Sequence, residues 1–116
     1  MIFELVWLPE AEAQFETMVR AAESATKTRE KTGKTKASKQ EGVFKQVYKC
    51  LQLLSTNPRH PGLATHEYHS LQHPYDPGQK VFEAYVQNKA PGAYRLFWCC
   101  GPGRNQITVI AITPHP

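Results

Sequence analysis

The spacing of apolar residues changes once along this chain, near residue 58, and that change constrains the fold more than any other feature. Before it, two stretches repeat apolar residues at the three- and four-residue spacing of an amphipathic helix. The first consists of Ala11, Phe15, Met18, Val19 and Ala22, and the second of Val43, Phe44, Val47, Tyr48, Cys50, Leu51 and Leu54. After it come short segments rich in β-branched and aromatic residues, separated by turns that contain Pro and Gly.

The segments on either side of the two helices predict β-strands. Residues 2–8 form a short apolar stretch, and Pro9 with two acids behind it marks the start of the first helix. Four more strands are predicted, at residues 64–71, 80–88, 93–100 and 106–113. Helices that are separate from a run of hairpin-linked strands indicate an α+β fold. We therefore predict an N-terminal strand, a two-helix hairpin and then an antiparallel sheet of about four strands, with the helices on one face.

The length and composition fit one domain. The chain has 116 residues, of which 41% are apolar, and this is enough to bury a core without disulfides or metals. Its apolar runs fall far short of the roughly 20 residues that span a bilayer. Cys50, Cys99 and Cys100 are an odd number without a CxxC spacing, so neither a disulfide framework nor a zinc site is predicted. We expect a single domain over residues 1–116 in the cytoplasm, with no signal peptide, metal or membrane contact.

The net charge of +4 comes from one segment of the chain. Residues 24–41 contain six of the fourteen basic residues and two of the ten acidic residues, so the remainder is balanced. The basic residues are Lys27, Arg29, Lys31, Lys34, Lys36 and Lys39. No apolar period survives there, which predicts a solvated extension of the helices around a polar basic loop at about 24–41. Such a cluster is either a nucleic-acid contact with salt-dependent affinity or a solvated loop.

Alternation along the strands predicts which side chains share a face. In residues 80–88 the small and apolar set should pack on the helices, which leaves Glu83 and Tyr85 on the open face. By the same alternation Arg95 lies on that face, and a hairpin would bring the three side chains together. One interpretation is an arginine that binds phosphate beside an acid–base group. The alternative is an exposed cross-strand ion pair worth under about 1 kcal/mol.

Histidine supplies a second set of candidates, because it gains and loses a proton near neutral pH. His66 and His69 lie on the weakest predicted strand, with His60 and His73 in its flanking turns, and His115 follows the last strand. His66 and His69 are three residues apart, so a straight strand should point them to opposite faces.

The order of the C-terminal motifs resembles the RelE/ParE superfamily of toxins. These motifs are NPRHPGL after a helix, KVFEAYV, AYRLFW, and ITVIAIT followed by a histidine, and the resemblance extends from Ile2 to His115. It implies the fold predicted above and a toxin of a toxin–antitoxin pair, held in check by an antitoxin protein. In this family RelE-like members cut mRNA in the ribosome without a metal or organic cofactor, whereas ParE-like members poison DNA gyrase.

The resemblance also implies roles for individual residues. Arg95 matches an arginine that is common in the penultimate strand, and Glu83 matches a frequent acidic position in the strand before it. Tyr85 stands where many members have arginine, so a phosphate contact is missing, and this tyrosine either stacks on a base or is an ordinary strand aromatic. His115 matches a C-terminal histidine that several RelE-like nucleases use. The candidate catalytic set is Arg95, Glu83 and His115, with His69 or Lys80 assisting, and the candidate RNA contacts are Tyr85 and the six basic residues of segment 24–41.

Three functions follow from these features. The leading prediction is a ribosome-dependent mRNA endoribonuclease whose partners are the ribosome, mRNA and an antitoxin. The second is a ParE-like inhibitor of DNA gyrase, which needs a binding surface and no chemistry. The third is a degenerate family member that acts only as a binding protein, which the departure at Tyr85 keeps open.

Overall fold

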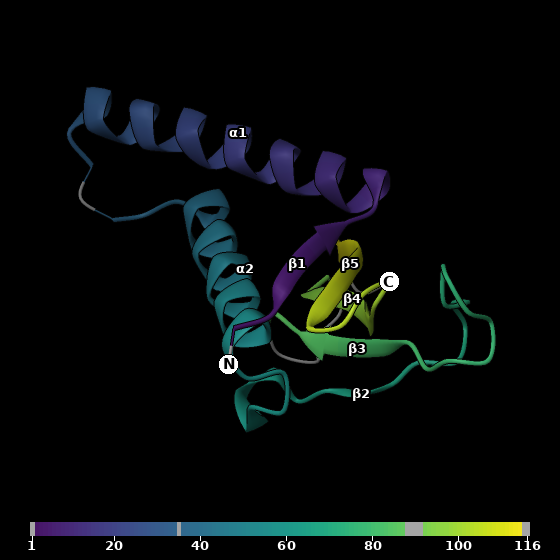
Figure 1. The fold of residues 1–116 in the computed structure, drawn as a ribbon. Helices are drawn as coiled ribbons and strands as arrows, with labels where there is room; N and C mark the ends of the chain where they lie inside the picture. The colour runs from purple at the N-terminus through teal and green to yellow at the C-terminus, as the bar shows by residue number, and fades with distance from the viewer. Residues whose placement is uncertain (1, 35, 88–91, 115–116) are drawn as a thin grey trace.

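The computed structural model describes residues 2–34, 36–87 and 92–114, and it shows an α+β fold (Figure 1). The elements in chain order are β1 (Glu4–Trp7), α1 (Pro9–Thr32), α2 (Lys39–Thr56), a 3-10 turn η1 (Pro61–Leu63), β2 (His66–Glu67), β3 (Phe82–Tyr85), β4 (Tyr94–Cys100) and β5 (Gln106–Pro114). This confirms the predicted order of strand, helical hairpin and four further strands.

The sheet has five strands in the order β1-β5-β4-β3-β2. Strands β2 to β5 are antiparallel neighbours, as predicted, but β1 also joins the sheet and pairs with β5 in parallel. The sequence predicted a mainly antiparallel sheet of about four strands, and β1 adds a fifth, parallel strand at its edge. A parallel pair requires a long crossover connection, and the two helices and the strands after them provide one.

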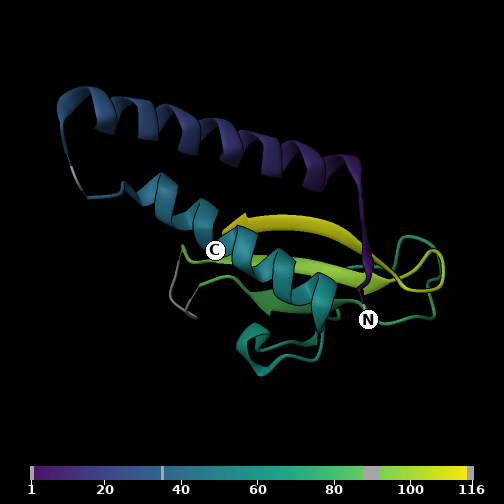
Figure 2. The same ribbon diagram turned by 60° about the vertical axis from the view of Figure 1, so that its left-hand side comes forward.

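The main core lies between the helices and one face of the sheet, as predicted. Buried residues of α2, among them Val47 and Leu54, pack with Leu96 of β4 and Ile112 of β5. Figures 1 and 2 show both helices on the same side of the sheet. Burial of such aliphatic side chains contributes about 1.5–3 kcal/mol each, so this interface supplies much of the stability of the fold.

The other face of the sheet is not open, contrary to the prediction. It carries a second, smaller cluster of buried residues, namely Val81, Phe97, Cys99, Ile110 and Ala111, with Leu8 and Tyr68 packed against it. The segment between β2 and β3 covers part of this face. The Tyr68 ring lies 4.6 Å from the Phe97 ring, and the Tyr75 hydroxyl lies 3.0 Å from the hydroxyl oxygen of Thr108.

The two helices extend far into segment 24–41, and the loop between them is shorter than the polar loop predicted there. Helix α1 continues to Thr32 and α2 begins at Lys39, so most of segment 24–41 is helical. Gly33, in the left-handed conformation at φ 74°, ends α1, and a capping box between Ser38 and Glu41 starts α2. These are local signals that set helix ends without any apolar period.

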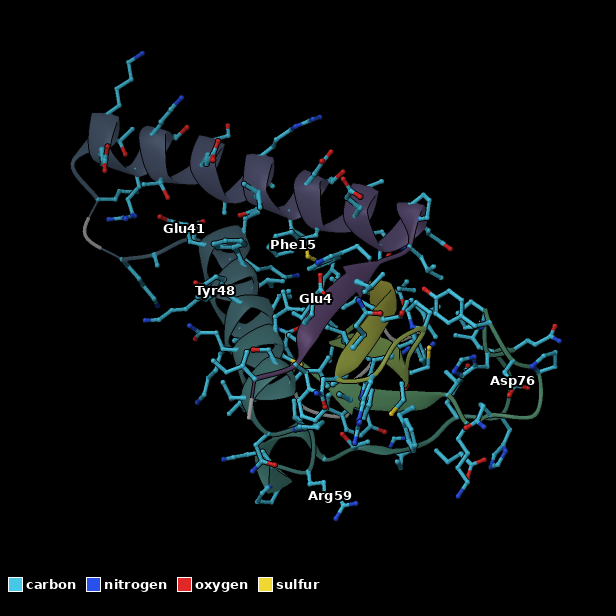
Figure 3. All side chains as sticks on the ribbon, viewed as in Figure 1. Glu4, Phe15, Glu41, Tyr48, Arg59 and Asp76 are labelled. Atoms are coloured by element: carbon cyan, nitrogen blue, oxygen red, sulfur yellow. The ribbon has the colours of Figure 1, made fainter. Side chains whose placement is uncertain are left out.

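Glu41 also links the last turns of α1 to the first turn of α2. Its carboxylate lies 2.9 Å from the Arg29 guanidinium, and it accepts hydrogen bonds from the Thr26 hydroxyl at 2.6 Å and the Ser38 backbone N–H at 2.6 Å. Figure 3 shows Glu41 at the seam between α1 and α2. These donors, Arg29 foremost and then Thr26, lower the pKa of Glu41 to about 2.

This lowered pKa predicts a pH dependence of stability. The stabilisation from Glu41 is fully present above the ordinary carboxyl pKa of 4.5 and is lost as the pH falls through about 2. We expect Glu41→Gln to melt at a lower temperature than wild type at pH 7, and the gap to narrow between pH 4.5 and pH 2. Thermal denaturation by circular dichroism at several pH values measures this. A gap that stays constant over that range would contradict the fastening role of the ionised carboxylate.

The hairpin makes the molecule elongated, with extents of 52 × 27 × 25 Å. Figure 2 shows α1 and the start of α2 projecting beyond the sheet. Among the described residues, no helix combines the length and the apolar character that crossing a membrane requires.

Candidate functional site

Three charged or titratable side chains meet on the face of the sheet that is turned away from the helices. His66 of β2 lies directly opposite Glu83 of β3 in the strand register, and its Nε2 is 2.5 Å from the Glu83 Oε1 atom. The other carboxylate oxygen accepts a hydrogen bond of 2.9 Å from Nη1 of Arg95 on β4. The carboxylate of Glu83 is thus held between an imidazole and a guanidinium that come from its two neighbouring strands.

Aromatic rings surround this cluster. The guanidinium carbon of Arg95 lies 4.8 Å from the centre of the Phe97 ring and 5.7 Å from that of Tyr68, a geometry in which ring faces attract the cation. On the other side, the Tyr85 ring lies 5.3 Å from the His66 ring. Tyr85 is directly opposite Arg95 in the register, so the predicted meeting of Glu83, Tyr85 and Arg95 is confirmed.

The burial of this cluster differs from the prediction. Glu83 is only 4% exposed, and the Arg95 side chain is 15% exposed, whereas both were expected to be solvated. The alternation argument assumed an open face, but Phe97 and Cys99 are apolar residues on the same face as Arg95 and belong to the second cluster. A buried ion pair costs more to break than an exposed one, because the remaining charge is left without water.

Accessibility distinguishes the three members chemically. The His66 side chain is 44% exposed while that of Glu83 is 5% exposed, so a molecule that arrives from solvent meets the imidazole first. Glu83 is placed to orient that ring and to stabilise a positive charge on it. A guanidinium carries five N–H donors, and within the described residues the Nε of Arg95 is buried without a hydrogen-bond partner.

Two predicted catalytic residues lie elsewhere, and a third is outside the described residues. His69 is 3.5 Å and Lys80 is 3.7 Å from the carboxylate of Glu67, which is opposite Phe82 and therefore on the other face of β2 and β3. The structure does not bring them to Glu83. His115 lies outside the described residues, so its proposed role stays a prediction.

Two further histidines have structural roles. His60 accepts a hydrogen bond from the Gly62 N–H at the start of η1. His73 is 6% exposed, and its Nε2 lies 2.9 Å from the Cys100 carbonyl oxygen. Its Nδ1 accepts from the backbone N–H groups of Tyr75 and Asp76. His73 therefore fastens the segment between β2 and β3 to the end of β4.

The basic residues of segment 24–41 lie together at the far end of the helical hairpin. Arg29 is occupied by Glu41, and the pKa of Arg29 is raised by that hydrogen bond and charge. The other five, which are Lys27, Lys31, Lys34, Lys36 and Lys39, are exposed. Figure 1 places this end of the hairpin away from β2 and β3. The basic cluster and the His66–Glu83–Arg95 cluster are therefore separate surfaces.

The cysteines do not form a site in the described residues. Burial raises the pKa of the Cys50 thiol to about 12 and that of Cys99 to about 11, so neither is a ready nucleophile. Cys100 is exposed. In the described ranges, no group of three His, Cys, Asp or Glu side chains could hold a metal ion.

Sequence reasoning missed the roles of His66 and Tyr68. Alternation correctly separated His66 from His69, but it could not say which of them faces Glu83. That choice depends on the register between β2 and β3, and β2 pairs over only two residues. Tyr68 follows the strand and supplies a ring to Arg95, which no local pattern marked.

Three solved structures share this fold. The chain is similar to a YoeB/ParE toxin from Agrobacterium tumefaciens, with 12% identity, a TM-score of 0.59 and coverage of 97% of this chain and 99% of that one. It is also similar to a chain of the archaeal RelE-RelB complex from Pyrococcus horikoshii OT3, with 10% identity, a TM-score of 0.56 and coverage of 98% and 96%. A third, the YoeB dimer from Staphylococcus aureus, has 11% identity, a TM-score of 0.56 and coverage of 100% of both chains. No protein-family model matches the sequence, and no curated protein matches it. At these identities the likeness establishes the RelE/ParE-like toxin fold.

Proposed function

We propose that this chain is the toxin of a toxin–antitoxin pair and that it cuts mRNA at the His66–Glu83–Arg95 cluster. The observation that carries the proposal is the carboxylate of Glu83 held between an accessible imidazole and a guanidinium from the two neighbouring strands. The shared fold with solved toxins, one of them in a complex named RelE-RelB, supports an antitoxin partner. The ribosome would present the mRNA, which places the reaction in the cytoplasm.

The chemistry needs no group beyond these side chains and the RNA. His66 accepts the proton of a ribose 2′-hydroxyl, and that oxygen attacks the adjacent phosphorus. The bond from phosphorus to the 5′ oxygen of the next nucleotide breaks, and His66 returns the proton to that oxygen. The products are a 2′,3′-cyclic phosphate and a 5′-hydroxyl, so protons and electrons balance.

The other members of the cluster assist this proton transfer. Glu83 keeps the imidazole in position and stabilises the imidazolium that forms between the two steps. Arg95 offsets the negative charge that develops on the phosphoryl oxygens, because its planar donors match them. Tyr85, next to His66, is in place to pack against a base of the RNA.

Induction of the chain alone in a bacterial host tests the proposal. We expect growth arrest together with cuts in a reporter mRNA, mapped by primer extension, and loss of both in a folded His66→Ala variant. Co-expression of an antitoxin-sized protein encoded beside the gene should restore growth. Arrest with intact mRNA and lost DNA supercoiling would instead favour a ParE-like action on gyrase, and absence of arrest would favour a non-toxic binding protein.

A further inference from the structure

The structure assigns a second RNA-binding surface to the hairpin tip, which we define as residues 24–34 and 36–41. We infer that the tip binds the phosphate backbone of a double-helical RNA segment, separately from the cleavage site. The inference rests on the proposed function in one respect, the choice of RNA over DNA. Phosphate binding is inferred from the location of charge and the shape of the tip, and the preference for a double helix from its lack of aromatic residues.

The charge at the tip is uncompensated. The segment 24–41 accounts for the whole net charge of the chain, since the remainder has equal numbers of basic and acidic residues. Glu41, the acid at the seam, is neutralised by Arg29, so the charges left on the tip are five exposed lysines and Glu30. Five ammonium groups so close together repel one another, and a polyanion relieves that repulsion while it releases its own counterions.

The tip also has a shape that admits a backbone strand. A depression of about 660 Å³ lies between the last turns of α1 and the loop to α2. Its wall on α1 consists of small and hydroxyl side chains, including Ser24, Ala25 and Thr28, and its opposite wall includes Lys34 and Lys36. Small residues allow close approach, hydroxyl groups can donate to phosphate oxygens, and the lysines supply charge. The Arg29–Glu41 contact beside it keeps the two helices at a fixed separation.

Residue types at the tip distinguish double-helical from single-stranded RNA. Proteins that hold unpaired strands stack the bases on aromatic side chains, and residues 24–41 contain none. Double-helical RNA hides its bases and presents phosphates and 2′-hydroxyls, which lysine and hydroxyl side chains recognise without a sequence requirement. The aromatic residues are instead at the cleavage site, where Tyr68 and Tyr85 flank the cluster.

The hairpin tip and the cleavage site can contact different parts of one RNA. The molecule is 52 Å long, and Figures 1 and 2 show the tip projecting from the sheet. A short unpaired RNA can occupy only the cleavage site, whereas a folded RNA or an RNA-containing particle can contact both surfaces. The tip would thereby raise the local concentration of the site on such a partner.

Binding of RNA hairpins to two variants with equal charge tests this inference. The tip variant is Lys27→Gln, Lys31→Gln, Lys34→Gln, Lys36→Gln and Lys39→Gln combined. The control carries Arg20→Gln, Lys45→Gln, Lys49→Gln, Arg59→Gln and Arg104→Gln, which are five exposed basic residues outside the tip. Arg59, for example, lies beyond the opposite end of α2 (Figure 3). Circular dichroism melts establish that both variants fold.

The probe is a fluorescent hairpin with a stem of about 20 base pairs, made of 2′-O-methyl RNA so that it cannot be cut. Its binding is followed by anisotropy from about 50 to about 200 mM salt. We expect the tip variant to bind at least about tenfold more weakly than the control, with a log–log salt slope shallower by about 3. An unpaired strand of equal length should lose much less affinity in the tip variant.

Each contrary result overturns a stated part of the inference. Equal affinities of the two variants, or no binding by wild type at low salt, would remove the tip as an RNA-binding surface. Equal losses of affinity for the hairpin and the unpaired strand would refute the preference for double-helical RNA. Tighter binding of wild type to a DNA hairpin would refute the preference for RNA over DNA. Because the probe cannot be cleaved, these outcomes are independent of the proposed nuclease activity.

Discussion

Replacement of His66 by alanine is expected to lower RNA cleavage by about 10²–10⁴-fold, the range that a positioned proton-transfer group supplies. His66 is the accessible member of the cluster, and Glu83 remains paired with Arg95 when the imidazole is removed. The fold should therefore survive, and the loss should appear in the cleavage rate at saturating RNA. Initial rates of cutting of ribosome-bound mRNA by purified variants, normalised to folded protein, measure this effect.

His69→Ala is the matched control for this prediction. His69 is the next histidine along the chain, but its side chain is 81% exposed and contacts Glu67 on the opposite face of the sheet. We expect this variant to cut RNA at a rate close to that of wild type. A large loss in His69→Ala with full activity in His66→Ala would invert the assignment and refute the site described above.

Replacement of Arg95 by alanine is expected to destabilise the fold by about 3 kcal/mol, because it removes one partner of a buried carboxylate. Glu83 is 4% exposed, so water cannot replace the lost guanidinium without a rearrangement. The alanine also abandons the packing of Arg95 on the Phe97 and Tyr68 rings. Urea denaturation followed by circular dichroism gives the change in the free energy of unfolding.

A double variant separates the electrostatic part of this loss from the packing part. In Glu83→Gln/Arg95→Ala no unpaired charge remains, so we expect a portion of the stability to return relative to Arg95→Ala alone. Arg20→Ala, which removes an exposed guanidinium 3.8 Å from exposed Glu16, should unfold like wild type. If Arg95→Ala had the same free energy of unfolding as wild type, the Glu83–Arg95 pair would be solvated, and the burial described for this site would be wrong.

Local sequence signals predicted helix ends where a proline starts or stops the helix, and they predicted which strand residues face the helices. Pro9 starts α1 and the Asn57–Pro58 pair follows α2, while alternation correctly assigned Ala84 and Leu96 to the helix-facing core. The same alternation placed Glu83, Tyr85 and Arg95 on one face of neighbouring strands. These features depend on residues within one turn or one strand, where spacing alone fixes geometry.

Features that depend on distant contacts were not predictable in this way. The parallel pairing of β1 with β5 joins residues about a hundred positions apart, and no short pattern encodes it. The burial of Glu83 depends on how the segment between β2 and β3 folds against β4 and β5, which His73 and Tyr75 determine through contacts with Cys100 and Thr108. The extent of α1 was missed for a different reason, since an exposed helix end has no apolar period to detect.

The chemistry of the cut RNA ends is the most direct test of the proposed cleavage at His66. RNA from cells that express the chain would be mapped at its new ends, and the upstream fragments tested for a 2′,3′-cyclic phosphate with a 2′,3′-cyclic phosphodiesterase and a ligase specific for that end. Attack by a 2′-hydroxyl through His66 predicts cyclic phosphate upstream and 5′-hydroxyl downstream, both absent with His66→Ala. Fragments that end in 3′-hydroxyl and 5′-phosphate, or identical cutting by His66→Ala, would contradict it.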